Sequence, residues 1–209
     1  MKTILIVGSS GRVGRSLLGF KSSFEYKLIG FQRTNLDESG DSEGVEFVFG
    51  DVLDFTKLED AIKKADIVFS VLSGRKTKPD YSILSIGMKN ILDAMKKNGK
   101  RRLINLGGAG VLDDPDYGKY RNRPSYPEFF KNVSAENLKV LSLLEASGLD
   151  WTMICAPEMP EGAAQGNYRL EIDFMPTGGR RISVGDVALC MYEIIEKNEY
   201  FKKKVGIAY

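Results

Sequence analysis

The sequence predicts an α/β protein built on a doubly wound parallel sheet of about seven strands, with helices on both faces. Short apolar runs alternate with longer amphipathic ones along all 209 residues, which is the pattern of βαβ units. Most of the short runs are almost continuously apolar, as expected of strands that are covered on both faces. The length allows one substantial core, so we expect a single domain over residues 1–209.

The expected elements follow the chain in regular alternation. The strands are predicted at Thr3–Val7, Lys27–Gln32, Val45–Gly50, Ile67–Leu72, Arg102–Leu106, Trp151–Cys155 and Val205–Tyr209. The helices are predicted at Arg12–Phe20, Phe55–Lys64, Asp80–Lys97, Phe129–Ala146 and Val184–Lys197.

Several boundaries carry typical start and stop residues. Thr56 stands three residues before Glu59, which indicates a capping box. Pro79 directly precedes the helix expected from Asp80. Gly99 and Gly148 lie where the C-terminal turns of two helices are expected.

Two segments interrupt the alternation, residues 107–128 and residues 156–181. Both follow strands of the predicted parallel sheet, and ligands bind beyond the carboxyl ends of such strands. We therefore expect the two segments to border a substrate pocket. The alternative is that they are surface loops without a special role.

Basic and acidic side chains nearly balance, with 30 Lys and Arg against 28 Asp and Glu. Neither sign forms a long block, so no nucleic-acid-binding surface is expected. The run Lys202–Lys204 comes nearest to one, and we interpret it as a solvated turn before the last strand.

Histidine is absent, which excludes histidine bases and histidine metal ligands, and we expect no metal site. Cys155 and Cys190 each lie in an apolar stretch, which predicts buried thiols and a reducing, cytoplasmic setting. The apolar run near Met1 is too short for a signal sequence, and no run approaches the roughly 20 residues of a membrane span. A monomer and a homodimer are both compatible with this sequence.

A glycine loop follows the first strand and carries the strongest functional signal. Glycines at three-residue spacing are weak evidence alone, because the chain has 22 glycines, but these three connect an apolar strand to an amphipathic helix. That context predicts a dinucleotide site in which Gly8 turns the chain, Gly11 admits the pyrophosphate and Gly14 packs the helix on the sheet. The candidate cofactor-binding residues here are Gly8, Ser10, Gly11, Arg12, Val13 and Gly14. The alternative is a strand-to-helix turn without a ligand.

The second strand ends at Arg33, where the adenosine ribose of a dinucleotide would arrive. An arginine offers a planar donor fork to a 2′-phosphate, so the sequence favours NADPH over NADH. Arg33 could instead be a solvated loop charge, and Asp37 keeps NADH open as an alternative.

Further candidates follow the third and fourth strands. Asp51 could accept a hydrogen bond from the adenine amino group, or it could begin the next helix, and Val52 adds an apolar side chain to the adenine pocket. Leu72, Ser73 and Gly74 would lie beneath the adenine ribose and the phosphates.

With these residues the chain resembles the atypical short-chain dehydrogenase/reductase superfamily, in its small NAD(P)H-binding branch of NmrA-like, NADH-flavin reductase-like and biliverdin reductase B-like proteins. The resemblance covers nearly the whole length. Besides the residues above it includes Leu149-Asp150-Trp151-Thr152, Gly166-x-Tyr168-Arg169-Leu170 and Ile182-Ser183-x-x-Asp186-x-Ala188. It implies a Rossmann fold in which Leu106, Gly107, Ala156 and Pro157 line the nicotinamide site.

The chain departs from that family at the catalytic residues. Family members use a Tyr-x-x-x-Lys pair and a serine after the fifth strand. Here Gly107 stands where the serine would be, and Pro127 stands four residues before Lys131. Lys131 could bind a nicotinamide ribose or face solvent, and Tyr126 is one residue out of register, so both are weak catalytic candidates.

The sequence therefore predicts an oxidoreductase that transfers a hydride from NADPH to a planar small-molecule acceptor such as a flavin or a quinone. Such a transfer needs orientation more than a protein acid, so the loss of the pair is tolerable. The alternative is an NADP(H)-binding redox sensor without catalysis, which the missing pair supports equally well. An epimerase or dehydratase is disfavoured because either would need a proton-transfer pair.

Overall fold

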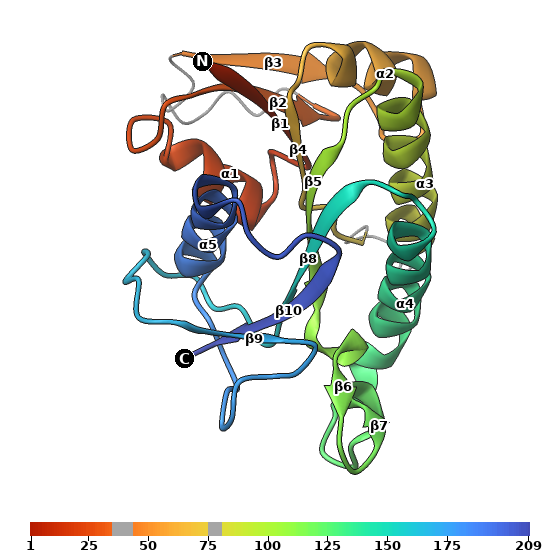
Figure 1. The fold of residues 1–209 in the computed structure, drawn as a ribbon, viewed down its shortest axis with the longest axis vertical. Coiled ribbons are helices and arrows are strands. Elements are labelled where there is room, and N and C mark those ends of the chain that lie inside the picture. Colours follow the sequence, from red (N-terminus) through yellow and green to blue (C-terminus); the bar gives the residue numbers. More distant parts are fainter. Residues whose placement is uncertain (35–43, 75–80) are drawn as a thin grey trace.

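The computed structural model describes residues 1–34, 44–74 and 81–209, which form one eight-stranded sheet flanked by five α-helices (Figure 1). The strands are β1 (Lys2–Val7), β2 (Tyr26–Gln32), β3 (Val45–Phe49), β4 (Ile67–Ser70), β5 (Arg102–Gly108), β8 (Asp150–Ala156), β9 (Arg169–Ile172) and β10 (Lys203–Ala208). The helices are α1 (Arg12–Gly19), α2 (Phe55–Lys63), α3 (Ser82–Lys97), α4 (Lys131–Glu145) and α5 (Val184–Lys197). The predicted doubly wound fold is confirmed, with one strand more than the seven expected.

The strand order is β3-β2-β1-β4-β5-β8-β10-β9, and every neighbouring pair is parallel except β10 and β9. The chain moves outward from β1 to β3 and then returns to β4 on the other side of β1. This reversal lies between β1 and β4, and in open α/β sheets ligands bind in the crevice at such a point.

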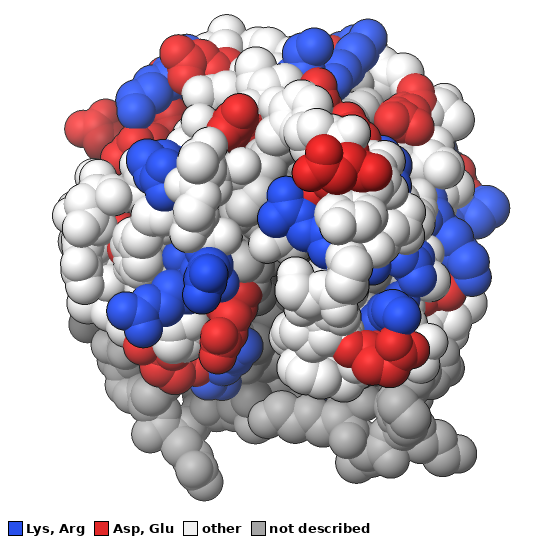
Figure 2. Space-filling model, turned by 90° about the horizontal axis from the view of Figure 1, so that it is seen from below, with Lys and Arg blue, Asp and Glu red and all other residues white. Residues whose placement is uncertain are grey.

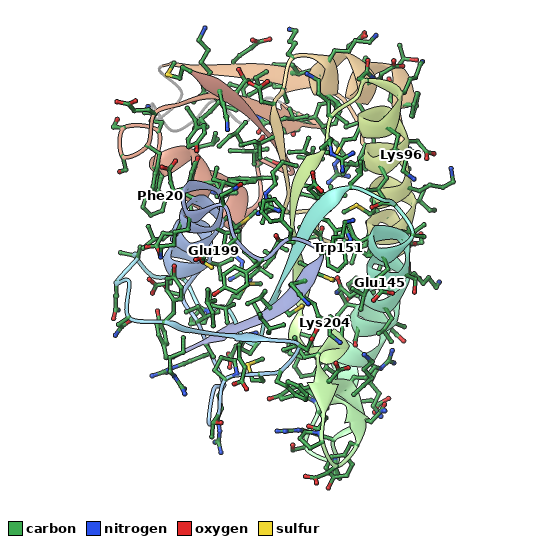
Figure 3. All side chains as sticks on the ribbon, in the orientation of Figure 1. Phe20, Lys96, Glu145, Trp151, Glu199 and Lys204 are labelled. Atoms are coloured by element: carbon green, nitrogen blue, oxygen red, sulfur yellow. The ribbon has the colours of Figure 1, made fainter. Side chains whose placement is uncertain are left out.

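The helices form two layers. Figure 1 shows α1 and α5 on one side of the sheet and α2, α3 and α4 on the other. Each layer covers its own apolar core, because alternate residues of a strand point to opposite faces. Trp151 of β8 belongs to the core under α4, and Figure 3 shows it between β8 and that helix.

The eighth strand, β9, comes from the segment that follows β8. Its residues Arg169–Ile172 pair antiparallel with Val205–Ala208 of β10. The segment after β5 also contains local structure, namely the hairpin of β6 (Asp113–Asp114) and β7 (Gly118–Lys119) and the short 3-10 helices Ala109–Val111 and Tyr120–Asn122. A third 3-10 helix, Glu128–Phe130, leads into α4.

The start of α2 differs from the prediction. The helix is capped by Asp54, whose carboxylate accepts a hydrogen bond of 3.2 Å from the Lys57 amide, so the capping box expected at Thr56 is wrong. Pro79 and Asp80 lie outside the described residues. The turns expected at Gly99 and Gly148 are confirmed, because both glycines adopt positive φ, 65° and 71°.

Lys204 also differs from the prediction of a solvated turn. It lies in β10, is 8% exposed, and its ammonium is 2.7 Å from an Asp113 carboxylate oxygen (Figure 3). The other Asp113 oxygen is 2.6 Å from the Lys119 ammonium. This chain of charges ties the β6–β7 hairpin to the sheet, so a residue that looked like a surface charge has a structural partner 91 positions away.

Both cysteine thiols are free and buried, as predicted, and burial raises the pKa of Cys155 and of Cys190 to about 12. They are therefore poor nucleophiles at neutral pH. In the part of the chain that the structure describes, no helix combines the length and the apolar character that crossing a bilayer requires.

Candidate functional site

The glycine loop joins β1 to α1 at the carboxyl edge of the sheet. Gly8 has φ +96°, and a β-carbon there would lie 2.9 Å from the Val71 carbonyl oxygen. A β-carbon on Gly14 would overlap the backbone of Gly8 and Ser9. At Gly11 it would meet, among the described residues beyond its chain neighbours, the Gly8 carbonyl oxygen alone, at 3.3 Å. The loop thus combines a tight turn and close helix packing with a glycine at the helix N-terminus.

The N-terminus of α1 faces this loop. Gly11 is the N-cap, and no side chain of the described residues caps the helix, so its first amides can serve an anion. The Ser10 carbonyl oxygen accepts a 2.7 Å hydrogen bond from the Arg15 guanidinium, which fixes the loop. Val13 is buried and packs in the core. The loop therefore offers backbone donors and the positive end of a helix dipole.

Arg12 reaches across the site. Its guanidinium donates a 2.7 Å hydrogen bond to the Met159 carbonyl oxygen and lies 3.6 Å from a Glu161 carboxylate oxygen. Both partners belong to the segment after β8. Arg12 therefore connects the glycine loop with one of the two segments predicted to border the substrate pocket.

The end of β2 is held against the glycine loop. The buried Ser9 hydroxyl donates a 2.9 Å hydrogen bond to the Gln32 side-chain oxygen, and Arg33 follows directly with an exposed side chain. Arg33 is thus a cation beside the loop, at the position predicted for a 2′-phosphate. Asp37, on which the NADH alternative depends, lies outside the described residues.

The residues after β3 form a turn before α2. The Asp51 carboxylate accepts a 3.0 Å hydrogen bond from the Leu53 amide, while Asp54 caps the helix, so Asp51 does not begin it. Val52 is 5% exposed, and its carbonyl oxygen accepts a 3.0 Å hydrogen bond from the Asn90 side chain. Val52 is therefore part of the core more than of an open surface.

The residues after β4 lie between this turn and α3. Leu72 packs beside Gly87 of α3, while Ser73 is exposed. Gly74 lies directly under the Tyr81 ring, where no β-carbon would fit. Ser73 is therefore the member of this group that presents a polar side chain to solvent.

The ends of β5 and β8 form a ledge with few side chains. Gly107 pairs with Cys155 and Gly108 with Ala156, and the half-buried Leu106 and Pro157 flank them. A β-carbon on Gly107 would overlap the methyl group at the end of the flexible Met153 side chain, which would have to move aside. The ledge, defined as Gly107, Gly108, Ala156 and Pro157, carries no ionisable group.

Helix α4 adds polar groups next to the ledge that sequence reasoning missed. Asn137 lies against Gly107 and Gly108, and the Ser134 hydroxyl lies against Gly110 one helical turn earlier. Both side chains are buried. The available signal was the pair of small polar residues three positions apart on the buried face of a predicted helix.

Tyr126 and Lys131 do not form a catalytic pair. The Tyr126 hydroxyl lies beside Gly110 and Ser134, whereas the Lys131 ammonium is 2.6 Å from a Glu128 carboxylate oxygen. Burial raises the pKa of Tyr126, against the opposing effects of the Ser134 hydroxyl and the Arg121 charge. Tyr126 is therefore a neutral phenol at physiological pH, able to donate a hydrogen bond but not to act as a base.

The two long segments lie at the same end of the molecule. Figure 1 shows the β6–β7 hairpin at the lower right and the segment containing β9 at the lower left. Figure 2 views this end from below and shows a hollow between two raised parts, with Lys and Arg side chains on both sides. The arrangement leaves room for a ligand between the two segments.

The segment after β8 is anchored at Asp186. This carboxylate is 0% exposed and accepts hydrogen bonds from the Gln165 amide (2.8 Å), the Gly166 amide (2.7 Å) and the Tyr209 hydroxyl (2.6 Å). The Ser183 hydroxyl donates to it as well, at 2.9 Å. Burial opposes ionisation, but these hydrogen bonds outweigh it and lower the pKa of Asp186.

Comparison with known proteins agrees with this geometry. A family model described as NAD(P)H-binding matches residues 8–198. Phenylcoumaran benzylic ether reductase IRL1 of Ginkgo biloba is 26% identical over 161 residues, which are 72% of this chain and 47% of that protein. The chain thus spans about half the length of this curated relative.

Solved structures share the fold over nearly the full length. A proposed NADH-flavin reductase from Streptococcus pneumoniae has a TM-score of 0.86 at 21% identity, covering 100% of this chain and 99% of that one. A short-chain dehydrogenase/reductase from Veillonella parvula in complex with NADP has a TM-score of 0.77 at 18% identity, covering 100% and 94%. At these identities the likeness shows the fold alone.

The glycine loop fits a dinucleotide, because Gly11 brings no side chain to the helix N-terminus and Gly14 lets that helix approach. The family model covers this loop, both long segments and the whole sheet except its first and last strands. The resemblance to the small atypical short-chain dehydrogenase/reductases is confirmed, and the chain belongs to the NAD(P)H-binding family whose model matches residues 8–198.

Proposed function

We propose that this protein is an NADPH-dependent reductase that passes a hydride to a planar acceptor, a flavin or a quinone. The observation that carries the proposal is the ledge at the ends of β5 and β8. It is built from Gly107, Gly108, Ala156 and Pro157, which present neither bulk nor charge. Two stacked rings would lie against the partly exposed Gly108 and Pro157, and transfer between stacked rings depends chiefly on proximity and orientation.

The residues of the site would bind and orient the cofactor and the acceptor. The amides at the start of α1 would bind the pyrophosphate, and Arg33 would bind the 2′-phosphate through its guanidinium fork. Asn137, beside the ledge, would orient the carboxamide or the acceptor through its side-chain amide. When bound, the reduced nicotinamide supplies the hydride, and a proton from solvent completes the reduction of the acceptor.

The function is tested by following the loss of NADPH absorbance with FMN, riboflavin or menadione as acceptor. We expect NADPH oxidation well above the rate without protein, with NADH a poorer donor. Tight NADP binding without turnover of any of these acceptors would contradict the proposal.

Arg33→Ala tests the choice of cofactor. We expect the dissociation constant for NADPH to rise about 10- to 100-fold, as for the loss of a charge-assisted hydrogen bond, with little change for NADH. Calorimetric titration of both cofactors measures this. Arg101→Ala is the control, because Arg101 is exposed and precedes β5 at the opposite edge of the sheet. Equal weakening of both cofactors by Arg33→Ala would refute the 2′-phosphate role.

Tyr126→Phe tests whether the reaction needs a protein acid. Because Lys131 pairs with Glu128 and not with the Tyr126 phenol, and because solvent can protonate the acceptor, we expect kcat with menadione to fall less than about threefold. Loss of a general acid typically costs about 10²- to 10⁴-fold. A decrease of that size would show that Tyr126 is catalytic.

A second candidate is an NADP(H)-binding redox sensor. Lys131 pairs with Glu128 and not with Tyr126, so the site lacks a tyrosine–lysine pair. A protein that binds the cofactor without catalysing a reaction would lack such a pair too. A sensor would bind NADPH and NADP with different conformations and leave all acceptors unreduced. The turnover assay decides between the two functions.

A further inference from the structure

Arg12 is the first residue of α1, and its side chain crosses from the glycine loop to the segment after β8. Half of the side chain is exposed, and two groups of that segment contact its guanidinium. The Nη1 atom donates the 2.7 Å hydrogen bond to the Met159 carbonyl oxygen, and the Nε atom faces the Glu161 carboxylate at 3.6 Å. One guanidinium thus has two partners of different strength.

The Met159 carbonyl oxygen is a fixed acceptor, because both neighbouring residues are bonded to the chain that enters α5. Figure 1 shows α5 next to α1 on the same side of the sheet. The hydrogen bond from Arg12 therefore joins two parts that regular structure holds in place. The bonds that hold the segment run from the Ile182 amide to the Glu158 carbonyl oxygen (3.0 Å) and from the Val184 amide to the Pro160 carbonyl oxygen (3.1 Å).

The Glu161 carboxylate is a loose partner. Its side chain is 69% exposed, and its distance of 3.6 Å from Nε exceeds that of a charge-assisted hydrogen bond. An exposed ion pair of this kind contributes little free energy, so another anion can displace the carboxylate. Arg12 is thus a cation with one firm neutral acceptor and one exchangeable anion.

The position of Arg12 relative to the cofactor gives this pair a role. The first turn of α1, which begins at Arg12, is where the pyrophosphate of a dinucleotide binds. The segment that carries Glu161 begins at the ledge, where the nicotinamide would lie. The negative charge of the pyrophosphate therefore arrives at the residue whose guanidinium Glu161 neutralises.

We propose that Glu161 is an internal competitor of the cofactor, because its carboxylate neutralises the guanidinium of Arg12 that otherwise binds the pyrophosphate. The bond to Met159 holds the guanidinium in place while the anion beside Nε changes from carboxylate to phosphate. Glu161 thereby lowers the affinity for the cofactor, and a lower affinity appears mainly as faster release. The inference rests on the proposed function for the binding of the cofactor and is independent of the acceptor.

The test is the affinity of the protein for NADPH and for NADH, measured by calorimetric titration at low salt. Glu161→Gln keeps the size of the side chain and removes its charge. We expect both cofactors to bind about three- to fivefold more tightly, since an exposed ion pair is worth up to about fivefold. The gain should be equal for the two cofactors, because they share the pyrophosphate.

Further variants assign the effect to the pair with Arg12. Arg12→Gln alone should bind NADPH about 10-fold more weakly, as the loss of one charge-assisted contact allows. In the Arg12→Gln background, Glu161→Gln should change the affinity by less than about 1.5-fold. Glu158→Gln is the matched control, because Glu158 is an exposed carboxylate of the same segment. It should also change the affinity by less than about 1.5-fold at physiological salt, where charges without direct contact are screened.

Weaker binding by Glu161→Gln would overturn the inference, because the carboxylate would then orient Arg12 for the cofactor and not compete with it. An unchanged affinity, an equal gain in Glu158→Gln, or a gain that persists in the Arg12→Gln background would overturn it as well. If Glu161→Gln binds both cofactors more tightly while the wild type reduces no acceptor, the competitor is supported and the reductase is not. If menadione is reduced and Glu161→Gln binds like the wild type, the reductase is supported and the competitor is not.

Discussion

Gly14→Ala is expected to weaken NADPH binding by about 100-fold, the upper end of what overpacking of a close contact costs. A β-carbon at Gly14 would overlap the Gly8 carbonyl oxygen and the backbone of Ser9, and backbone atoms cannot move aside as a flexible side chain can. The loop must therefore shift, and the amides of α1 lose their alignment with the phosphates. Calorimetric titration with NADPH measures the loss.

Gly19→Ala provides the matched control in the same helix. A β-carbon at Gly19 has no neighbour within 4 Å among residues 1–34, 44–74 and 81–209, and alanine is the better helix former. We expect unchanged NADPH affinity and an unchanged or slightly raised melting temperature. If both variants bind NADPH like the wild type, the loop does not hold the cofactor.

Asp186→Ala is expected to lower the free energy of unfolding by about 3–5 kcal/mol, because it removes a buried carboxylate that accepts four hydrogen bonds. The amides of Gln165 and Gly166 and the hydroxyl of Tyr209 all lose their partner. Urea unfolding followed by circular dichroism measures the change. Asp93→Ala is the control, because the side chain of Asp93 is 44% exposed and forms a surface ion pair with Lys89 within α3, and it should cost less than about 1 kcal/mol.

The stabilisation by Asp186 also depends on pH. Its pKa is lowered in the folded protein, so the contribution is fully present above the ordinary aspartate pKa of about 3.9 and is lost as the pH falls below it. We expect the difference in stability between wild type and Asp186→Asn to shrink as the pH is lowered from 6 toward 3, to about half or less. A difference independent of pH would show that the charge is unimportant.

Most of the fold follows from the apolar pattern. Strands buried on both faces and amphipathic helices leave periods in the sequence that do not depend on tertiary contacts, so β1 to β5 and their helices could be predicted. Strand β9 could not, because Arg169–Ile172 alternates over only four residues and becomes a strand through pairing with β10. The cap of α2 was ambiguous for a local reason, since Asp54 and Thr56 both offer an acceptor near the first turn.

In the candidate site, too, some roles could be predicted from local sequence and others could not. The roles of Gly8 and Gly14 depend on local backbone geometry and could be predicted from spacing and context. The contact between Arg12 and Met159 spans 147 positions, and the packing of Asn137 against Gly107 depends on how α4 lies on β5. The two small polar residues on the buried face of α4 leave a local signal, but the partners of Asn137 and of Arg12 do not, because both contacts arise only when distant elements meet.

The short antiparallel strand β9 limits which residues beside the hollow can be redesigned. It covers the edge of β10, whose Val205–Ala208 would otherwise present open hydrogen-bonding groups to other chains. Its own residues Arg169 and Glu171 are exposed charges, which discourage further pairing. The segment that borders the hollow therefore also protects the protein from aggregation. Loop grafting aimed at a new acceptor should spare Arg169–Ile172 and confine its changes to the residues on either side.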